Sequence, residues 1–248
     1  MTAQCMEAEI YKLRRTPSVW WLAVASLAAV SLGLVLTLAL APIRSDDDIR
    51  SLLSFVGTGG LVTLLLGVVW TAGEYRHRTI VSTVLTTPRR LPAYLGQIAG
   101  LVLAGAVIGL ACAVLTTVLT LPWLAAKDVS FGVSFGTVLA QYSGGIAFAA
   151  LSAGIGGGIG ALVRNQVAAA AVLFAYLAIV DPMLASLVPS YGKYGVTSIS
   201  ITLSGGTYGV DGQGGSLLPV PAAAAVYVAC AAILVTAGAV ATLRRELP

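Results

Sequence analysis

Residues Pro17–Ala41 read PSVWWLAVASLAAVSLGLVLTLALA, and this stretch decides the fold of the chain. It contains no charged side chain, and a helix of this length, at about 1.5 Å per residue, crosses the roughly 30 Å hydrocarbon core of a bilayer. Pro17 suits the first turn of a helix, and Trp20 and Trp21 suit the head-group boundary. The apolar run exceeds the roughly 7–15 residues of a signal-peptide core. The stretch therefore predicts an uncleaved first transmembrane helix.

Composition extends this prediction to the whole chain. Hydrophobic residues make up 58% of the 248 residues, charged residues only 10%, and the mean hydropathy is +0.93. A soluble domain of this length needs roughly a quarter of its residues charged. The apolar segments are long runs rather than the alternating segments of a barrel, and a helix satisfies its own backbone in lipid. We expect an all-α integral membrane protein with a single transmembrane domain, residues 1–248.

Six segments are long and apolar enough to span a bilayer. Pro122 is expected to close the third of them, because proline interrupts helix hydrogen bonding. The longest stretch between spans, residues 188–219, is expected on the outer side. Within it, residues 196–203 alternate in polarity and predict either a short strand or a helix lying in the outer interface. The predicted spans are residues 17–41, 52–72, 94–121, 135–163, 166–187 and 220–243.

Charge asymmetry gives the orientation. With six spans, ten of the fourteen Lys and Arg residues and four acidic residues lie on the side of the termini, a net charge of +6. The other side has four basic and six acidic residues, a net charge of −2. Basic residues accumulate in cytoplasmic loops. We expect a multi-pass protein of the cell membrane with both termini in the cytoplasm.

Glycines indicate close helix packing. Gly105 and Gly109 are four residues apart in the third span, and small residues at this spacing let helix backbones approach closely. Packing within the chain is the main interpretation, with a dimer seam or a moving hinge as alternatives. Further glycines crowd the end of the fourth span: Gly154, Gly156, Gly157, Gly158 and Gly160.

The residues that carry catalysis are mostly missing from the sequence. His77 is the single histidine and has no acidic residue placed to orient it, and Gly192-Lys193 lacks the flanking pattern of a phosphate-binding loop. The three cysteines are scattered and have no metal-ligand spacing. We therefore expect no catalytic residue, no metal site, no cofactor bound by this chain and no nucleic-acid partner.

The segment from Glu74 to Arg90, EYRHRTIVSTVLTTPRR, is the most informative connection. Ile80, Val84 and Leu85 fall on one face of a short helix that Pro88 would end. Such a basic amphipathic helix can lie among anionic head groups, or it can insert into a groove of a cytoplasmic partner. The residues alone leave both interpretations open.

This segment resembles the coupling segment of type-two ATP-binding-cassette (ABC) exporter permeases. That family has an acidic residue, a basic cluster, Thr followed by Ile or Leu, a later Leu, and then Pro with a basic residue. Arg78 stands where the family often has Gly. Residues 7–16 resemble the amphipathic helix that precedes the first span of these permeases, and the six-span layout is similar too. The matching residues are Glu74, Arg76, Thr79, Ile80, Leu85, Pro88 and Arg90.

The resemblance implies a function and partners. Two permease subunits would pair, as a homodimer or a similar heterodimer within the lipid bilayer. Two copies of a cytoplasmic ABC ATPase, holding ATP and Mg, would dock on them and drive export of an amphipathic or hydrophobic substrate such as an antibiotic, peptide or lipid. The expected ATPase contacts are Glu74, Arg76, Arg78, Thr79, Ile80, Leu85, Pro88 and Arg90. Glu74 is expected to pair with a basic partner residue or with Arg78.

Polar side chains inside the spans are candidates for a substrate pathway, because polar groups in a membrane are costly and are often functional. Gln141, Tyr142, Tyr176 and Asp181 are the candidates. Hydrogen bonds between helices explain them equally well. Two other functions remain open: a membrane-embedded enzyme that modifies lipids and uses His77, and a membrane anchor or sensor subunit without transport.

Overall fold

The computed structural model describes residues 11–41, 43, 45–76, 90–127, 129, 132–163, 165–206 and 217–244. Within these ranges the chain is helical, and six helices are long and apolar enough to cross a membrane. The predicted all-α, six-span fold is therefore confirmed. The elements are α2 (Pro17–Leu40), α3 (Asp46–Leu53), α4 (Val56–Arg76), α6 (Arg90–Ala126), α7 (Phe135–Val163), α8 (Gln166–Ala175), η1 (Tyr176–Val180), α9 (Asp181–Leu187), α10 (Pro189–Tyr194), α11 (Val196–Leu203) and α12 (Val220–Arg244).

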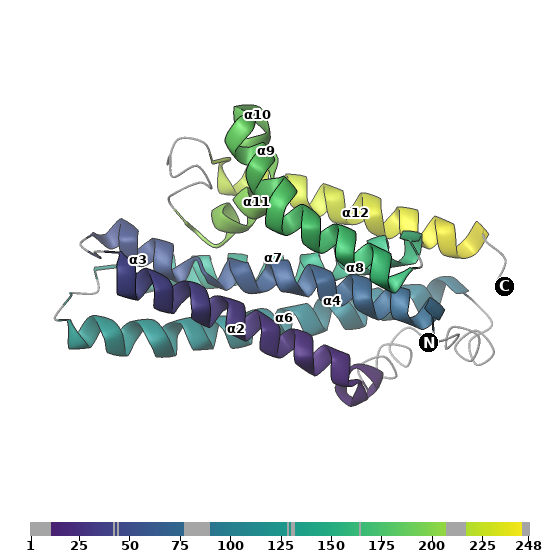
Figure 1. Cartoon of the computed structure of the whole chain (residues 1–248), viewed down its shortest axis with the longest axis horizontal. Coiled ribbons are helices and arrows are strands. Elements are labelled where there is room, and N and C mark those ends of the chain that lie inside the picture. Colours follow the sequence, from purple (N-terminus) through teal and green to yellow (C-terminus); the bar gives the residue numbers. More distant parts are fainter. Residues whose placement is uncertain are drawn as a thin grey trace.

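The helices form an elongated bundle around α7, which packs against α4, α6 and α12 (Figure 1). The start of α2, the end of α4, the start of α6 and the end of α12 gather at one end, which we call the terminal end. α3, the end of α6 and the start of α7 form the opposite, distal end. Tyr227 of α12 stacks on Phe148 of α7 and shares a 2.7 Å hydrogen bond with Ser152.

Glycines let the backbones of α4 and α7 approach each other closely. A Cβ on Gly156 would collide with the carbonyl oxygen of Leu64, and a Cβ on Gly67 would collide with that of Ala153. Gly105 of α6 is likewise pressed against α7. The glycines that the sequence marked as packing residues thus serve contacts within the chain, as predicted.

The second span begins earlier than predicted. Asp46, Asp47 and Asp48, which fall between the first two predicted spans, start α3. Asp48 and Ser45 form a capping box there: the Asp48 N–H donates to Ser45 Oγ at 3.2 Å, and the Ser45 N–H donates to Asp48 Oδ2 at 2.9 Å. This arrangement satisfies N–H groups at the helix start, and acidic residues there interact favourably with the helix dipole. α4 follows after a short break at residues 54–55.

The prediction that Pro122 closes the third span is wrong, because α6 continues to Ala126. Beyond the proline, Leu124 is buried in a small apolar cluster with Ile49 and Leu53 of α3 and with Val133. This burial holds the last turn although proline lacks the N–H of a regular helix residue. α6 has 37 residues and is therefore about 55 Å long.

The last three spans agree closely with their predicted bounds. The fifth, residues 166–187, contains a π-helical turn at Tyr176–Val180, in which the Asp181 N–H bonds to the Tyr176 carbonyl. This wider turn lies directly before Pro182, whose nitrogen has no hydrogen to donate. The fourth is Phe135–Val163 and the sixth Val220–Arg244.

Residues 188–219, the segment predicted on the outer side, contain α10 and α11. Of the two structures left open for residues 196–203, the helix is the one that forms, but it does not lie on the surface. α11 packs against α4, α7 and α12, and Ile199 and Leu203 are buried. Residues 207–216 lie outside the described residues. In the predicted amphipathic helix, residues 11–15 are helical, and residues 7–10 lie outside the described part.

Candidate functional site

Glu74 is the centre of a polar contact at the terminal end. It lies in the last turn of α4, and its side chain is 12% exposed. Lys12, from the helical residues before α2, places its Nζ 3.4 Å from Glu74 Oε1. Gln97 of α6 donates from Nε2 to Glu74 Oε2 at 2.9 Å. One carboxylate therefore joins three separate parts of the chain, and we call Lys12, Glu74 and Gln97 the Glu74 tie.

The electrostatics of this position explain why Glu74 needs these partners. A carboxylate near the C-terminus of a helix interacts unfavourably with the helix dipole, and burial removes its hydration. A lysine and an amide donor offset both costs. The basic residue found beside Glu74 is Lys12, which the sequence analysis placed in the preceding helix without assigning it a partner.

The predicted ATPase-contact residues mostly lie outside the described residues. This applies to Arg78, Thr79, Ile80, Leu85 and Pro88. Arg76 is the last residue of α4, and Arg90 is the first residue of α6. The connection 77–89 therefore joins two helices that the Glu74 tie already holds to each other.

A second contact fixes the start of α6. The Tyr94 hydroxyl donates to the carbonyl oxygen of Val235 in α12 at 3.0 Å. Gly238 makes room for it, because a Cβ at that position would meet the Tyr94 hydroxyl oxygen. Both helices that flank residues 77–89 are thus bonded to the rest of the bundle.

Two substitutions at Glu74 should separate its ion pair from its hydrogen bond. Glu74→Gln removes the charge but keeps an acceptor for Gln97, so we expect a loss of about 0.5–1 kcal/mol in unfolding free energy. Glu74→Ala also leaves the buried Gln97 amide without this acceptor, so we expect a loss of about 1–3 kcal/mol. Thermal unfolding in detergent at low and high salt measures both. Equal losses in the two variants would show that the hydrogen bond between Gln97 and Glu74 does not contribute to the unfolding free energy.

Gln141 and Tyr142, predicted to line a pathway, bond within the chain. Gln141 is buried, and its Nε2 donates at 2.6 Å to the carbonyl oxygen of Gly205, just after α11. Gly205 has φ +73°, which favours glycine, and a Cβ there would meet the Gln141 side chain. The Tyr142 hydroxyl shares a 2.8 Å hydrogen bond with Thr117 of α6.

Asp181 accepts hydrogen bonds from the start of α11. Its Oδ2 accepts from the Thr197 N–H at 3.0 Å, and its Oδ1 accepts from the Val196 N–H at 3.2 Å and from the Tyr191 hydroxyl at 2.7 Å. The hydroxyl groups of Tyr176 and Tyr191 share a 2.6 Å hydrogen bond. Partial burial and the bonds with Tyr176 and Asp181 raise the pKa of Tyr191, so this phenol stays protonated and donates.

The four predicted pathway residues thus lie in three places: Tyr176 and Asp181 at the start of α11, Gln141 just after its end, and Tyr142 against α6. Each forms hydrogen bonds between parts of the same chain, which is the alternative explanation that the sequence left open. Gln97 and Tyr191 were not among the predicted residues. A single amide in the apolar run of the third span is a usable signal for Gln97, whereas no local pattern distinguishes Tyr191.

Neither the side chains at these contacts nor a comparison with known proteins assigns an activity to the chain. Among the described residues, no group of three or more His, Cys, Asp or Glu side chains could hold a metal ion. The Glu74 tie joins three structural elements of the chain. No protein-family model matches the chain, and no curated protein matches it either.

Proposed function

We propose that this chain is the membrane-spanning permease subunit of an ABC transporter. It would export an amphipathic or hydrophobic substrate, using ATP hydrolysed by a separate cytoplasmic subunit. The observation that supports this proposal is the Glu74 tie, which bonds α4, α6 and residues 11–15 to one another where the connection 77–89 leaves and re-enters the bundle. A partner that displaces residues 77–89 would therefore act on helices that are bonded to each other.

The packing of the bundle suits such transmission. A partner that displaces residues 77–89 acts on both α4 and α6, and α4 is locked to α7 by the glycine contacts. These helices would therefore move together instead of bending singly, because packed interfaces switch between discrete arrangements. ATP binding in the partner would bias the equilibrium between two such arrangements.

The proposal includes orientation and assembly. Both termini and residues 77–89 would face the cytoplasm, as the distribution of basic residues indicates. The helices at the periphery of the bundle expose large apolar areas to lipid and to a second permease subunit. In the most apolar 18-residue stretch of α2, and in that of residues 166–187, only 17% is buried inside the chain, and in that of α12 only 22%.

The test is a partner-dependent ATPase measurement. The tagged full-length chain is isolated from its own host in mild detergent, and ATP hydrolysis sensitive to orthovanadate is measured. We expect activity to accompany the wild-type chain and to fall by about tenfold or more when Ile80 and Leu85 are both replaced by Asp, because charges on an apolar docking face must be desolvated.

Ser82→Asp is the matched control, because Ser82 falls on another face of the helix that the sequence predicts here, and it should retain the activity. Both variants must be recovered from the membrane fraction in wild-type amounts, which shows that insertion is intact. Absence of the ATPase from the wild-type preparation, or its equal retention by the double variant, would contradict the proposal.

A further inference from the structure

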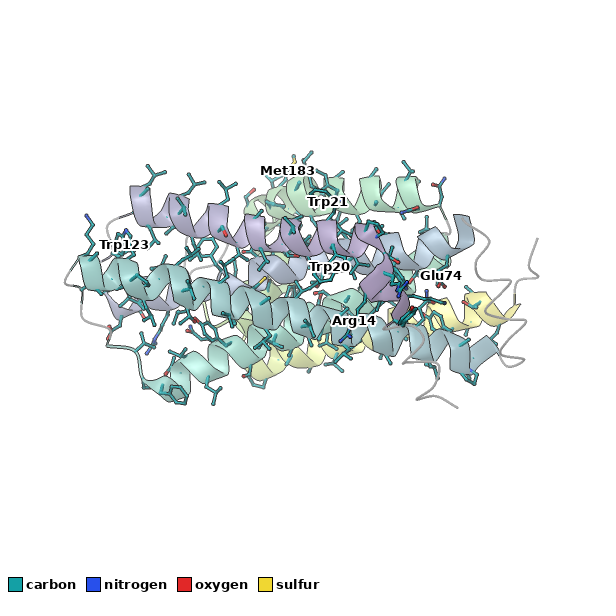
Figure 2. All side chains as sticks on the ribbon, turned by 90° about the horizontal axis from the view of Figure 1, so that it is seen from below. Arg14, Trp20, Trp21, Glu74, Trp123 and Met183 are labelled. Carbon is teal, nitrogen blue, oxygen red and sulfur yellow. The ribbon has the colours of Figure 1, made fainter. Side chains whose placement is uncertain are left out.

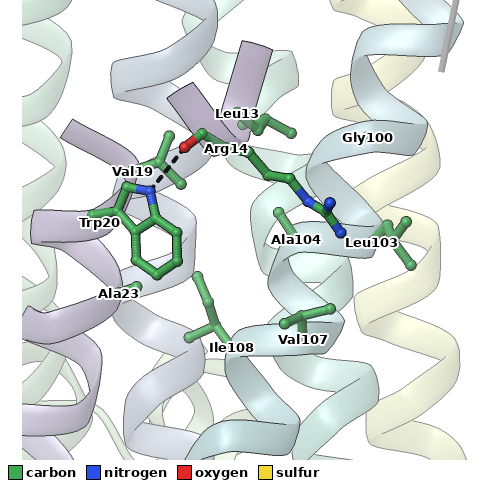
Figure 3. Close-up of a pocket in the computed structure, with 10 residues that line it drawn as sticks. All are labelled: Leu13, Arg14, Val19, Trp20, Ala23, Gly100, Leu103, Ala104, Val107 and Ile108. Atoms are coloured by element: carbon green, nitrogen blue, oxygen red, sulfur yellow. Dashed lines mark hydrogen bonds between the residues drawn. The ribbon is translucent and has the colours of Figure 1, made fainter. Parts of the chain in front are cut away.

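A groove of about 510 Å³ lies between the start of α2 and the middle of α6. Figure 3 shows Trp20 and Ala23 on the α2 side, Leu103 and Val107 on the α6 side, and Arg14 reaching across from the preceding helix. Apart from Arg14, the side chains that line it are apolar or small. Its volume lies within the roughly 300–1,000 Å³ of small-molecule sites.

The junction before α2 fixes the position of Arg14. The Trp20 indole Nε1 donates to the Arg14 carbonyl oxygen at 2.9 Å, so the ring spans the turn at Pro17 and forms one wall of the groove. Leu13 is buried in the main apolar cluster and anchors the same helical turn. The backbone of Arg14 is therefore held at one rim of the groove.

The guanidinium of Arg14 is available to a ligand. Arg14 is exposed, and no carboxylate of the described residues lies within ion-pair distance of it. Figure 2 labels Arg14 and Glu74 in the same part of the bundle. Among the described residues, Glu74 is bound to Lys12 and Gln97. A cation beside an apolar groove complements a molecule with an anionic head and a hydrocarbon tail.

We propose that this groove binds a phospholipid with an anionic head group, whose phosphate contacts Arg14 and whose acyl chain lies between Trp20 and Val107. Trp20 is 61% exposed and Val107 60% exposed in the isolated chain, so the groove opens sideways toward the bilayer. A tryptophan next to a basic residue is typical of the head-group boundary, where the phosphate of a lipid lies. The proposal rests on the membrane fold and is independent of transport.

The test is photolabelling of the full-length chain. The chain is reconstituted in nanodiscs of phosphatidylcholine that contain phosphatidylglycerol with a diazirine on its acyl chain. After illumination, labelled peptides are located by mass spectrometry. We expect labels on residues 19–23 and 103–108, and about fivefold less labelling there with the equivalent phosphatidylcholine probe, since one basic residue at a membrane surface contributes about that factor.

Four variants sharpen the result. Arg14→Ala should reduce labelling of the groove about fivefold, and Arg14→Lys should retain most of it. Arg15→Ala removes the same charge one residue later, from a side chain that lies over the Tyr11 ring, and should leave labelling unchanged. Ala104→Phe should fill the groove and block its labels while labels on α12 persist.

Several outcomes would overturn the proposal. One is equal labelling of the groove by both probes, and another is equal loss in Arg14→Ala and Arg15→Ala, which would indicate only general surface charge. A third is a disulfide between two chains carrying Val107→Cys, formed with a loss of groove labelling, because a second copy would then cover the groove.

Discussion

Gly156→Ala is expected to lower the unfolding free energy by about 2 kcal/mol, a large effect for the addition of one methyl group. The Cβ of an alanine at this position would collide with the backbone carbonyl oxygen of Leu64. A backbone oxygen within α4 cannot rotate away as a side chain can, so α4 and α7 must separate. Overpacking of this kind typically costs about 1–3 kcal/mol.

Gly136→Ala is the matched control, because it makes the same change in the same helix where a Cβ meets nothing within 4 Å. Alanine favours helix by up to about 1 kcal/mol over glycine, so this variant should be neutral or slightly stabilised. Thermal unfolding in detergent, followed by tryptophan fluorescence, compares the two. Similar midpoints for both variants would show that the α4–α7 contact can relax more easily than its backbone geometry implies.

Asp181→Ala is expected to release α10 and α11 from the bundle. The carboxylate is fully buried and accepts from the Val196 and Thr197 N–H groups and from the Tyr191 hydroxyl. Removing it leaves these partly buried donors unsatisfied, at up to about 1–3 kcal/mol each. Hydrogen exchange of residues 189–206 should accelerate by about a hundredfold, since each factor of ten corresponds to about 1.4 kcal/mol. The exchange of α4 and α7 should not change.

Asp181→Asn distinguishes loss of the acceptors from loss of the charge. An asparagine keeps one side-chain oxygen as an acceptor, so residues 189–206 should exchange at a rate between those of the wild-type chain and Asp181→Ala. Asp47→Ala, at an exposed position of α3, should have no effect on this segment. If exchange accelerated equally throughout the bundle, Asp181 would support the whole fold instead of these two helices.

The number and type of spans could be predicted because the bilayer imposes a simple requirement. Each crossing needs about 20 apolar residues in a helix that satisfies its own backbone. The runs beginning at Pro17 and Phe135 meet this requirement without ambiguity. The contribution of glycines to packing could also be predicted, because close approach of two helix backbones excludes larger side chains.

Helix ends and partners could not be predicted in the same way, because they depend on contacts distant in the sequence. α6 continues past Pro122 because Leu124 is buried against α3, and α3 precedes it in the chain. Glu74 contacts Lys12, 62 residues earlier, and Gln97, 23 residues later. Periodicity in a single segment contains no information about such pairs.

The length of α6 makes the chain sensitive to the thickness of its membrane. Exposed apolar side chains follow this helix from Leu91 to Leu121, a distance of about 45 Å at the rise of an α-helix. The hydrocarbon core is about 30 Å thick, so an upright α6 would be mismatched to it. Tilting of the bundle or local thickening of the bilayer reduces this mismatch. Membranes that differ by a few ångströms would therefore hold this protein at different inclinations.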